Sequence, residues 1–351
     1  MTAPIPATID EVTPGWLADA AGFDVTTVAT EQIGVGVGVS SGLYRLRLTG
    51  GTDCPSSVVV KLPALDPAAV FTSSVLRMYI REVRFFEELA ATSPIRVPAC
   101  HFGVVDPESS AFVLVLEDLG GLRPVDQVEG MALADAQQAV DELAAWHATW
   151  WGKADAMADA GLTISLGDPI YPAILPMVWA EGWEKVVTGL DVPEPVLAVG
   201  AKYLDVMGGL LTDLSQAPTT MAHGDYRADN ILFAPDGSVA LLDFQLIGTG
   251  SGAYDLAYFV TQSLEPDVAS VNERALFDRW VDGLRAAGVA ADDLDRMWDD
   301  YRKAALFCLV YPVVASRGMD LGDSRQTGLL DCMLNRNSRA IDELRLAELL
   351  P

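Results

Sequence analysis

The chain is poor in cysteine, in basic residues and in long apolar runs. Only four of its 351 residues are cysteines, and no two form a C-x-x-C pair, which favours reduced thiols over disulfides or a zinc site. The longest apolar run, from Ala304 to Ser316, lies between Lys303 and Arg317 and contains Pro312. It falls short of the roughly 18 residues that a membrane-spanning helix needs. We therefore expect a buried helix here and no membrane span.

The N-terminus lacks positive charge, and the whole chain is strongly acidic. No Lys or Arg precedes Arg45, so no secretory signal is expected and a cytoplasmic protein is predicted. The formal net charge of −26 argues against binding to nucleic acid, because an acidic surface repels phosphates. This surface either attracts a cationic substrate or only keeps the protein in solution. The net charge does not decide between these two roles.

Two carboxylates and an amide stand at a spacing that is typical of phosphoryl transfer. In HGDYRADNILF, Asp225 stands five residues before Asn230, and Asp243 follows in LLDFQ, eighteen residues after Asp225. A kinase needs one carboxylate that accepts the proton of the attacking hydroxyl, and an Asn and a second Asp that hold Mg²⁺ on the nucleotide phosphates. The apolar runs on either side of residues 235–237 predict a β-hairpin that brings Asn230 and Asp243 side by side. The alternative interpretation is that these are ordinary turn residues.

A glycine-rich segment near the N-terminus fits the same chemistry. Gly36 and Gly38 allow the backbone to close over phosphate oxygens, and Ser40 and Ser41 add hydroxyl donors. Residues 43–48 alternate in the period of a strand. This predicts strand, glycine turn, strand, as in kinases, and not the helix that follows a dinucleotide-binding loop. A glycine-rich hairpin without a ligand is the alternative.

Lys61 interrupts the β-branched run SVVVKL at residues 57–62. It is either an exposed strand end or the residue that reaches the α- and β-phosphates of a nucleotide. The stretch from residue 75 to 90 has apolar residues at helical spacing and carries three acids, Glu82, Glu87 and Glu88. One of these acids is the expected partner of Lys61, whereas acids on a helix are more usually solvated.

The motifs HGDYRADNILF, LLDFQLIGTGSGAYDLAYF and VLVLEDLG together resemble the aminoglycoside phosphotransferase and choline kinase superfamily, and most closely its ecdysteroid-kinase-like branch. The resemblance runs from about residue 33 to about residue 260. It implies an α+β, protein-kinase-like fold with two lobes that acts on small molecules. We expect a small β-rich lobe at residues 1–118, including an N-terminal extension, and a larger, mostly helical lobe at residues 119–351.

The resemblance also implies roles for four residues that spacing alone leaves open. It makes Glu82 the partner of Lys61, and it places the backbone of Glu117 and Leu119 in the hinge that meets adenine. Asp255, in GAYDLAYF, resembles the family's structural Asp that steadies the loops of the site. Only twelve residues separate it from Asp243, so there is no room for a long activation segment, and a protein substrate is disfavoured.

Histidine and tryptophan offer less specific signals. We interpret His147 as a packed helix histidine and His223 as a loop brace, because in kinase chemistry an Asp already supplies the base. The candidates for contact with the substrate are Trp179 and Trp183, within a predicted pocket wall at residues 169–187, and Trp298. Aromatic faces near acids suit an amphiphilic or cationic alcohol. The alternative is that these tryptophans belong to the core.

The sequence therefore predicts a small-molecule O-phosphotransferase that uses ATP, or GTP, together with Mg²⁺. Asp225 is the predicted base, Asn230 and Asp243 the predicted metal ligands, and Lys61 the predicted phosphate ligand. A nucleotide-binding regulatory pseudokinase is the second hypothesis, although such proteins typically lack one of these groups. The sequence names neither the acceptor nor the oligomeric state.

Overall fold

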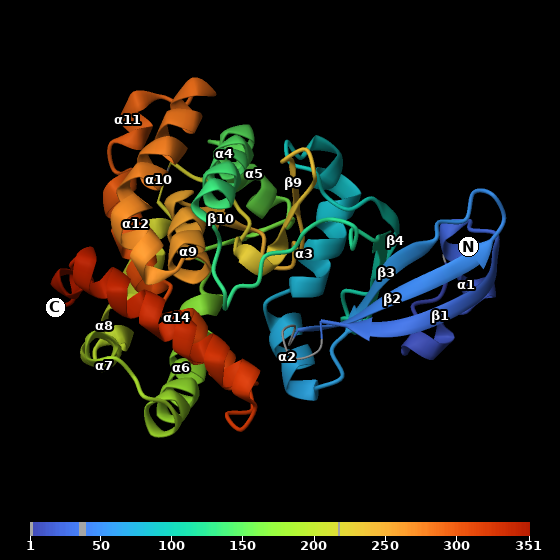
Figure 1. The fold of residues 1–351 in the computed structure, drawn as a ribbon, viewed down its shortest axis with the longest axis horizontal. Helices are drawn as coiled ribbons and strands as arrows, with labels where there is room; N and C mark the ends of the chain where they lie inside the picture. Colours follow the sequence, from blue (N-terminus) through green and yellow to red (C-terminus); the bar gives the residue numbers. More distant parts are fainter. Residues whose placement is uncertain (1–2, 35–39, 217) are drawn as a thin grey trace. The chain divides into compact units, whose positions relative to one another are not determined.

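The computed structural model describes residues 3–34, 40–216 and 218–351, and the chain divides into two compact units (Figure 1). One unit comprises Met1–Leu122 and Leu242–Gln245 and is here called the sheet unit. The other comprises Arg123–Leu241 and Leu246–Pro351 and is called the helical unit. The predicted α+β class is confirmed, since one unit is rich in strands and the other in helices. The lobe boundary after residue 118 stays a prediction.

The sheet unit is built on a five-stranded antiparallel sheet in the order β1-β2-β3-β5-β4. The strands are β1 (Val25–Ile33), β2 (Ser41–Gly50), β3 (Ser57–Pro63), β4 (Cys100–Val105) and β5 (Phe112–Glu117). β2 buries every second residue from Gly42 to Leu48, as expected for a strand with one face on a core. The register pairs Lys61 of β3 with Leu43 of β2 and Leu114 of β5, so Lys61 sits on a central strand.

Short helices accompany this sheet. They are η1 (Ile9–Glu11), α1 (Pro14–Ala21), α2 (Pro67–Val75), α3 (Met78–Arg84), the π-turn η2 (Phe85–Leu89) and η3 (Ala90–Thr92). In α1 the Thr13 hydroxyl accepts from Trp16 N, and Trp16 and Leu17 pack into the core below the sheet. The helix expected at residues 75–90 is interrupted at its start. Arg77 adopts a left-handed φ of 53°, and this turn separates α2 from α3.

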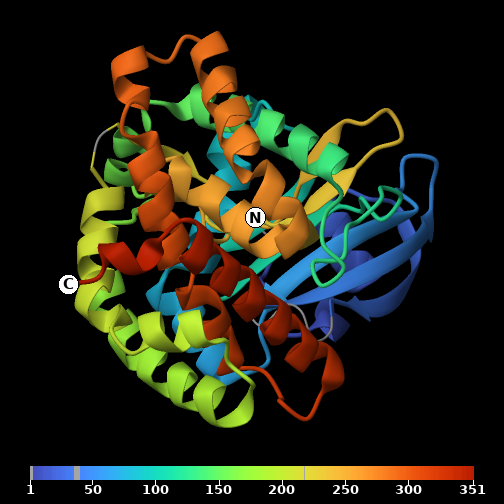
Figure 2. The same ribbon diagram turned by 60° about the vertical axis from the view of Figure 1, so that its left-hand side comes forward.

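The helical unit contains most of the helices of the chain. They are α4 (Leu133–Trp150), α5 (Ala154–Asp159), α6 (Ile170–Gly189), α7 (Glu194–Gly200), α8 (Tyr203–Leu214), α9 (Ala253–Ser263), α10 (Pro266–Ala286), α11 (Ala291–Leu294), α12 (Met297–Phe307), α13 (Val310–Ser316), α14 (Ser324–Glu343) and η5 (Leu346–Leu349). Every residue of α9 is buried, as expected for a helix at the centre of a core. α10, α12 and α14 pack around it (Figure 2).

Five short strands of the helical unit lie next to the motif residues. β6 (Ile164–Ser165), β10 (Gly248–Gly250) and β7 (Thr220–Ala222) form one small sheet. The 3₁₀ turn η4 (Ala228–Asn230) leads into the hairpin of β8 (Ile231–Phe233) and β9 (Val239–Leu241), in which Ile231 pairs with Leu241. Gly237 closes the turn at φ 86°, which only glycine adopts freely. The predicted hairpin is confirmed.

The apolar run at residues 304–316 is not a single buried helix, as the sequence suggested. It comprises the end of α12 and the whole of α13, with a break at Cys308 and Leu309. Pro312 has no N–H to donate to the Cys308 carbonyl, which accepts from Tyr311 N instead (3.2 Å). Among the residues that the structure describes, no helix combines the length and the apolar character needed to cross a membrane.

Candidate active site

The loop that carries Asp225 is held by Asp255 from the start of α9. The Asp255 carboxylate accepts hydrogen bonds from His223 N (2.6 Å) and Gly224 N (2.9 Å). Gly224 has a φ of 85°, and a Cβ there would lie 2.1 Å from the Leu246 carbonyl oxygen, so the turn requires glycine. Asp255 thus has the loop-bracing role that the family resemblance implied.

His147 and His223 brace this loop. Trp280 Nε1, which can only donate, points at His147 Nδ1 (3.0 Å), and His147 Nε2 lies 3.1 Å from Asp255 Oδ2. His147 therefore accepts at Nδ1 and donates through Nε2 to Asp255. His223 Nδ1 accepts from Asp225 N (3.3 Å). Both histidines are completely buried, in keeping with the structural interpretation of each.

Three side chains hold the carboxylate of Asp225. Oδ1 accepts from Arg227 Nε (3.1 Å) and from the Tyr258 hydroxyl (2.9 Å). Oδ2 accepts from Asn230 Nδ2 (2.7 Å), which also donates to the Asp225 carbonyl (2.8 Å). The Asn230 amide nitrogen thus faces Asp225, and its oxygen is left on the opposite side of the amide group. This orientation suits an Asn that offers its oxygen to a metal ion.

Arg227 is itself fixed by two further groups. Its Nη1 donates to Asp229 Oδ2 (2.6 Å) and also to Gln127 Oε1. Asp229 Oδ1 accepts from Gln127 N (3.1 Å). The neighbouring charges of Asp225 and Asp229 raise the pKa of Arg227 although burial alone would lower it. Arg227 is therefore a fixed cation beside Asp225.

Lys61, Glu82 and Asp243 form a second charged group, in the sheet unit. Lys61 Nζ lies 2.7 Å from Glu82 Oε1 and 2.9 Å from Asp243 Oδ1. The expected pairing of Lys61 with Glu82 is thus present, and the binding of phosphate by Lys61 stays a prediction. Asp243 has a left-handed φ of 65°, and the next residue, Phe244, stacks on Phe85 at 3.8 Å between ring centroids.

The charges in this group do not balance, because two carboxylates share one ammonium. Burial, and next the charge of Asp243, raise the pKa of Glu82 from 4.5 to about 7 against the attraction of Lys61. Burial alone would lower the pKa of Lys61, but the charges of Asp243 and Glu82 outweigh it and raise that pKa. A proton or a metal cation would neutralise the excess negative charge. The carboxylate of Asp243 is an oxygen ligand of the kind that Mg²⁺ prefers.

Of the residues expected near the nucleotide, Gly36 and Gly38 lie outside the residues that the structure describes. Ser40 Oγ donates to Gln245 Oε1 (2.9 Å). The Ser41 hydroxyl is buried and has no hydrogen-bond partner within the described chain. In the expected hinge, Glu117 N already donates to the Ala99 carbonyl (2.8 Å), and the role of Glu117 and Leu119 toward adenine stays a prediction.

The three tryptophans expected near the substrate do not form one cluster. Trp179 is 2% exposed and stacks between Trp183 (5.5 Å between centroids) and Tyr203 (4.0 Å). These are the contacts of a core residue. Trp298 stacks on Tyr301 and lies under the guanidinium of Arg274. The roles of these tryptophans toward an acceptor stay predictions.

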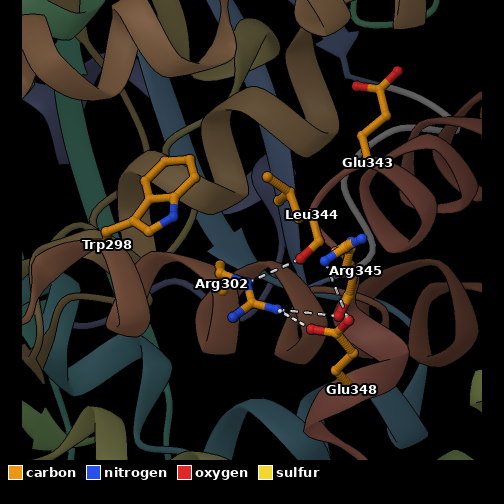
Figure 3. A pocket seen from close by; sticks show the side chains of 6 residues that line it. All are labelled: Trp298, Arg302, Glu343, Leu344, Arg345 and Glu348. Carbon is orange, nitrogen blue, oxygen red and sulfur yellow. Dashed lines mark hydrogen bonds and ion pairs between the residues drawn. The ribbon is translucent and has the colours of Figure 1, made fainter.

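Trp298 borders an open hollow of about 300 Å³ on the helical unit. The hollow is lined by Trp298, Arg302, Glu343, Leu344, Arg345 and Glu348 (Figure 3). Arg302 is engaged there by the carbonyls of Leu344 (2.9 Å) and Arg345 (3.1 Å). Its guanidinium therefore caps the end of α14. The lining holds two arginines and two glutamates, so that their charges balance.

Arg227, Tyr258 and Gln127 were not singled out from the sequence. Arg227 and Tyr258 lie inside the two motifs, HGDYRADN and YDLAYF, and that position is the only sequence signal for them. Gln127 lies 100 residues from Arg227, in a segment without any motif. Within the described ranges, no group of three or more His, Cys, Asp or Glu side chains could hold a metal ion by itself.

Two comparisons with known protein sequences give one match to a family model and none to a curated protein. A family model described as the phosphotransferase enzyme family matches residues 33–307, well over half of the chain. A search of curated protein sequences finds no match.

Solved structures similar to this chain cover most of its length. A choline kinase from Cryptosporidium parvum has a TM-score of 0.56 at 10% identity, over 95% of this chain and 93% of that one. The amicoumacin kinase hAmiN, in complex with AMP-PNP, Ca²⁺ and Ami, has a TM-score of 0.56 at 13% identity, over 94% and 93%. The GDP complex of aminoglycoside 2'-phosphotransferase-IIIa has a TM-score of 0.56 at 14% identity, over 90% and 94%. At such identities the likeness establishes a kinase-like fold and no substrate.

Proposed function

Because the chain belongs to the phosphotransferase enzyme family, we propose that it is a small-molecule kinase. It transfers the γ-phosphoryl group of ATP, or of GTP, to a hydroxyl of a small organic acceptor. The observation that carries this proposal is the held carboxylate of Asp225, whose Oδ2 accepts at 2.7 Å from the Asn230 amide nitrogen, so that the Asn230 oxygen faces away from Asp225. Such a carboxylate can orient a hydroxyl and take its proton.

The proposed roles follow from the chemistry of each group. Asp225 is the general base, and Asn230 and Asp243 are the Mg²⁺ ligands, with phosphates and water completing the coordination. When bound, Mg²⁺ would offset the charge that develops on the transferred phosphoryl group. Lys61, positioned by Glu82 at 2.7 Å, binds the α- and β-phosphates.

The remaining assignments concern the two substrates. The glycine-rich segment with Gly36, Gly38, Ser40 and Ser41 is proposed to cover the phosphates, and the backbone of Glu117 and Leu119 to meet adenine. For the acceptor we propose a wall at residues 169–187 with Trp183 as its aromatic face. Met177 of that stretch is 58% exposed, which supports an apolar surface there. An acceptor with both apolar and cationic parts would suit such a wall.

A turnover screen tests the proposal. The purified protein, with Mg²⁺ and ATP or GTP, is mixed with aminoglycosides, macrolides, choline and other amino-alcohols, and phosphorylated products are identified by mass. Asp225→Asn should lower turnover by about 10² or more, the scale for removing a positioned general base, with nucleotide affinity changed only a few-fold. Asp278→Asn is the matched control, because among the described residues Asp278 forms an ion pair only with Arg274, on the surface of α10.

The outcomes separate the proposal from its alternative. Turnover that survives in Asp225→Asn would remove Asp225 as the base. Nucleotide binding without any phosphorylated product would instead favour the regulatory pseudokinase. The enzyme hypothesis is supported by the presence of all four expected residues, which are Lys61, Asp225, Asn230 and Asp243. A pseudokinase would not need the base.

A further inference from the structure

The hydrogen bonds of Asp225 are unequally divided between its two carboxylate oxygens. A carboxylate has about four lone-pair positions, two on each oxygen. Oδ1 receives two donors, Arg227 Nε and the Tyr258 hydroxyl, whereas Oδ2 receives only Asn230 Nδ2. Donors among the described residues thus occupy three of the four positions, and the fourth position, on Oδ2, receives no donor.

Both donors to Oδ1 are held in place by the interior of the helical unit. Tyr258 is 3% exposed, lies on the fully buried α9, and packs against Tyr311 at 4.2 Å between ring centroids. Burial, and next the charge of Asp225, raise the pKa of Tyr258 well above its usual value, so the phenol keeps its proton and can only donate to Oδ1. Arg227 is fixed by Gln127 and Asp229. Neither donor can turn away without leaving a buried polar group unpaired.

We propose that Tyr258 and Arg227 are positioning residues that occupy Oδ1 of Asp225, and that Oδ2 is the atom that receives the proton of the acceptor hydroxyl. This inference rests on the proposed phosphotransfer. Asn230 then has two tasks, since its Nδ2 sets the direction of the open position on Oδ2 while its oxygen faces away.

The proposed step at Oδ2 moves one proton and one phosphoryl group. The acceptor O–H bond breaks and its proton passes to Oδ2, while the acceptor oxygen forms a bond to the γ-phosphorus. The bond from that phosphorus to the β,γ-bridging oxygen breaks, and its electron pair leaves with the nucleoside diphosphate. The donors on Oδ1 keep the carboxylate from rotating and presenting the wrong oxygen.

Tyr258→Phe tests the positioning role, with Tyr203→Phe as matched control. Tyr203 is equally buried and its hydroxyl also donates one hydrogen bond, but to the Phe307 carbonyl (2.7 Å) and not to Asp225. We expect Tyr258→Phe to lower kcat by about tenfold or more while the KM values of nucleotide and acceptor stay within about twofold. Tyr203→Phe should leave all three values unchanged.

A double-mutant cycle then asks whether Tyr258 acts through Asp225. In an Asp225→Asn background, Tyr258→Phe should cause no further loss of kcat, because the group it positions is already gone. Losses that multiply in the double variant would overturn the inference, and so would a wild-type kcat in Tyr258→Phe.

Crystal structures of the wild type and of Tyr258→Phe give a measurement that does not depend on turnover. The wild type should show the Tyr258 hydroxyl and Arg227 Nε both on Oδ1, and the variant should show the carboxylate rotated. A wild type in which Tyr258 bonds elsewhere, or a variant with an unmoved carboxylate, would overturn the inference. If the wild type phosphorylates no acceptor, the proposed function fails, and these structures still decide the positioning role.

Discussion

Lys61 binds two carboxylates at once, and this arrangement makes the sheet unit sensitive to pH. Glu82 lies 2.7 Å and Asp243 lies 2.9 Å from the same ammonium nitrogen. One ammonium cannot neutralise both, and burial raises the pKa of Glu82 from 4.5 to about 7. At the residue scale, then, these three side chains together hold one more carboxylate than ammonium.

The pH dependence of stability follows from that pKa. Unfolded Glu82 loses its proton near pH 4.5 and folded Glu82 near pH 7, so folding takes up a proton between these values. The stability supplied by protonated Glu82 is present below pH 4.5 and is lost as the pH rises to 7, by roughly 3 kcal/mol in all. Glu82→Gln lacks this titration. The Tm of the wild type minus the Tm of the variant should therefore fall as the pH rises from 4.5 through 7.

Glu88→Gln serves as the control for this titration, because Glu88 lies on the surface and, within the part of the chain that the structure describes, forms an ion pair only with Arg84. Its Tm difference from wild type should stay level over the same pH range. A Tm difference for Glu82→Gln that stayed level or rose with pH would show that Lys61 stabilises the charged form of Glu82 more than burial opposes it.

At the element scale, the packing of α6 against α13 depends on Gly182, a residue of α6. A Cβ on Gly182 would lie 2.1 Å from the Val313 carbonyl oxygen, and the Ser316 hydroxyl donates to the Gly182 carbonyl (3.3 Å). Backbone thus meets backbone at this crossing, where no side chain can move aside. The position of α6, which carries the proposed acceptor wall, is set by this contact.

Gly182→Ala should therefore destabilise the protein although alanine favours helix. We expect a loss of about 1 to 3 kcal/mol in the free energy of unfolding, the usual cost of overpacking. Gly209→Ala in α8 is the control, since nothing lies within 4 Å of a Cβ there, and it should gain up to about 1 kcal/mol from helix propensity. Urea unfolding of both variants measures the difference. Equal effects would mean that α6 and α13 separate readily.

The excess of acidic residues concerns the whole molecule. With 49 acidic and 23 basic residues, the net charge is −26 at pH 7, and like charges repel one another most in the compact state. The ion pairs of the surface, such as Arg274 with Asp278 at 3.0 Å, compensate only part of this charge. The folded state is thus less stable at low ionic strength than its packing alone would give.

Added salt should accordingly raise the melting temperature. Raising NaCl from about 10 mM to about 150 mM shortens the screening length from about 30 Å to about 8 Å, which weakens repulsion across the surface. We expect Tm to rise by a few degrees, and to rise equally with KCl because screening depends on ionic strength. A Tm that falls with salt would show that the surface ion pairs outweigh the self-repulsion.

The sequence by itself determined the parts of the site that lie close together along the chain. The spacing of Asp225 and Asn230 and the hairpin after them follow from local backbone geometry. The pairing of Lys61 with Glu82 came from a family resemblance, since three acids at residues 82–88 compete by charge alone. The α+β class could be predicted because strand and helix periods are visible in single segments.

Only the tertiary structure decided which groups hold Asp225 and which tryptophans are buried. Tyr258 and Gln127 lie 33 and 100 residues from their partners Asp225 and Arg227, and Trp179 stacks on Tyr203 of another helix. Such contacts depend on how helices pack, which no local pattern encodes. The apolar pattern of residues 304–316 did not predict the break between α12 and α13, although the run contains Pro312. The physical reason is that local spacing fixes the backbone, whereas long-range packing decides which buried donor each acceptor receives.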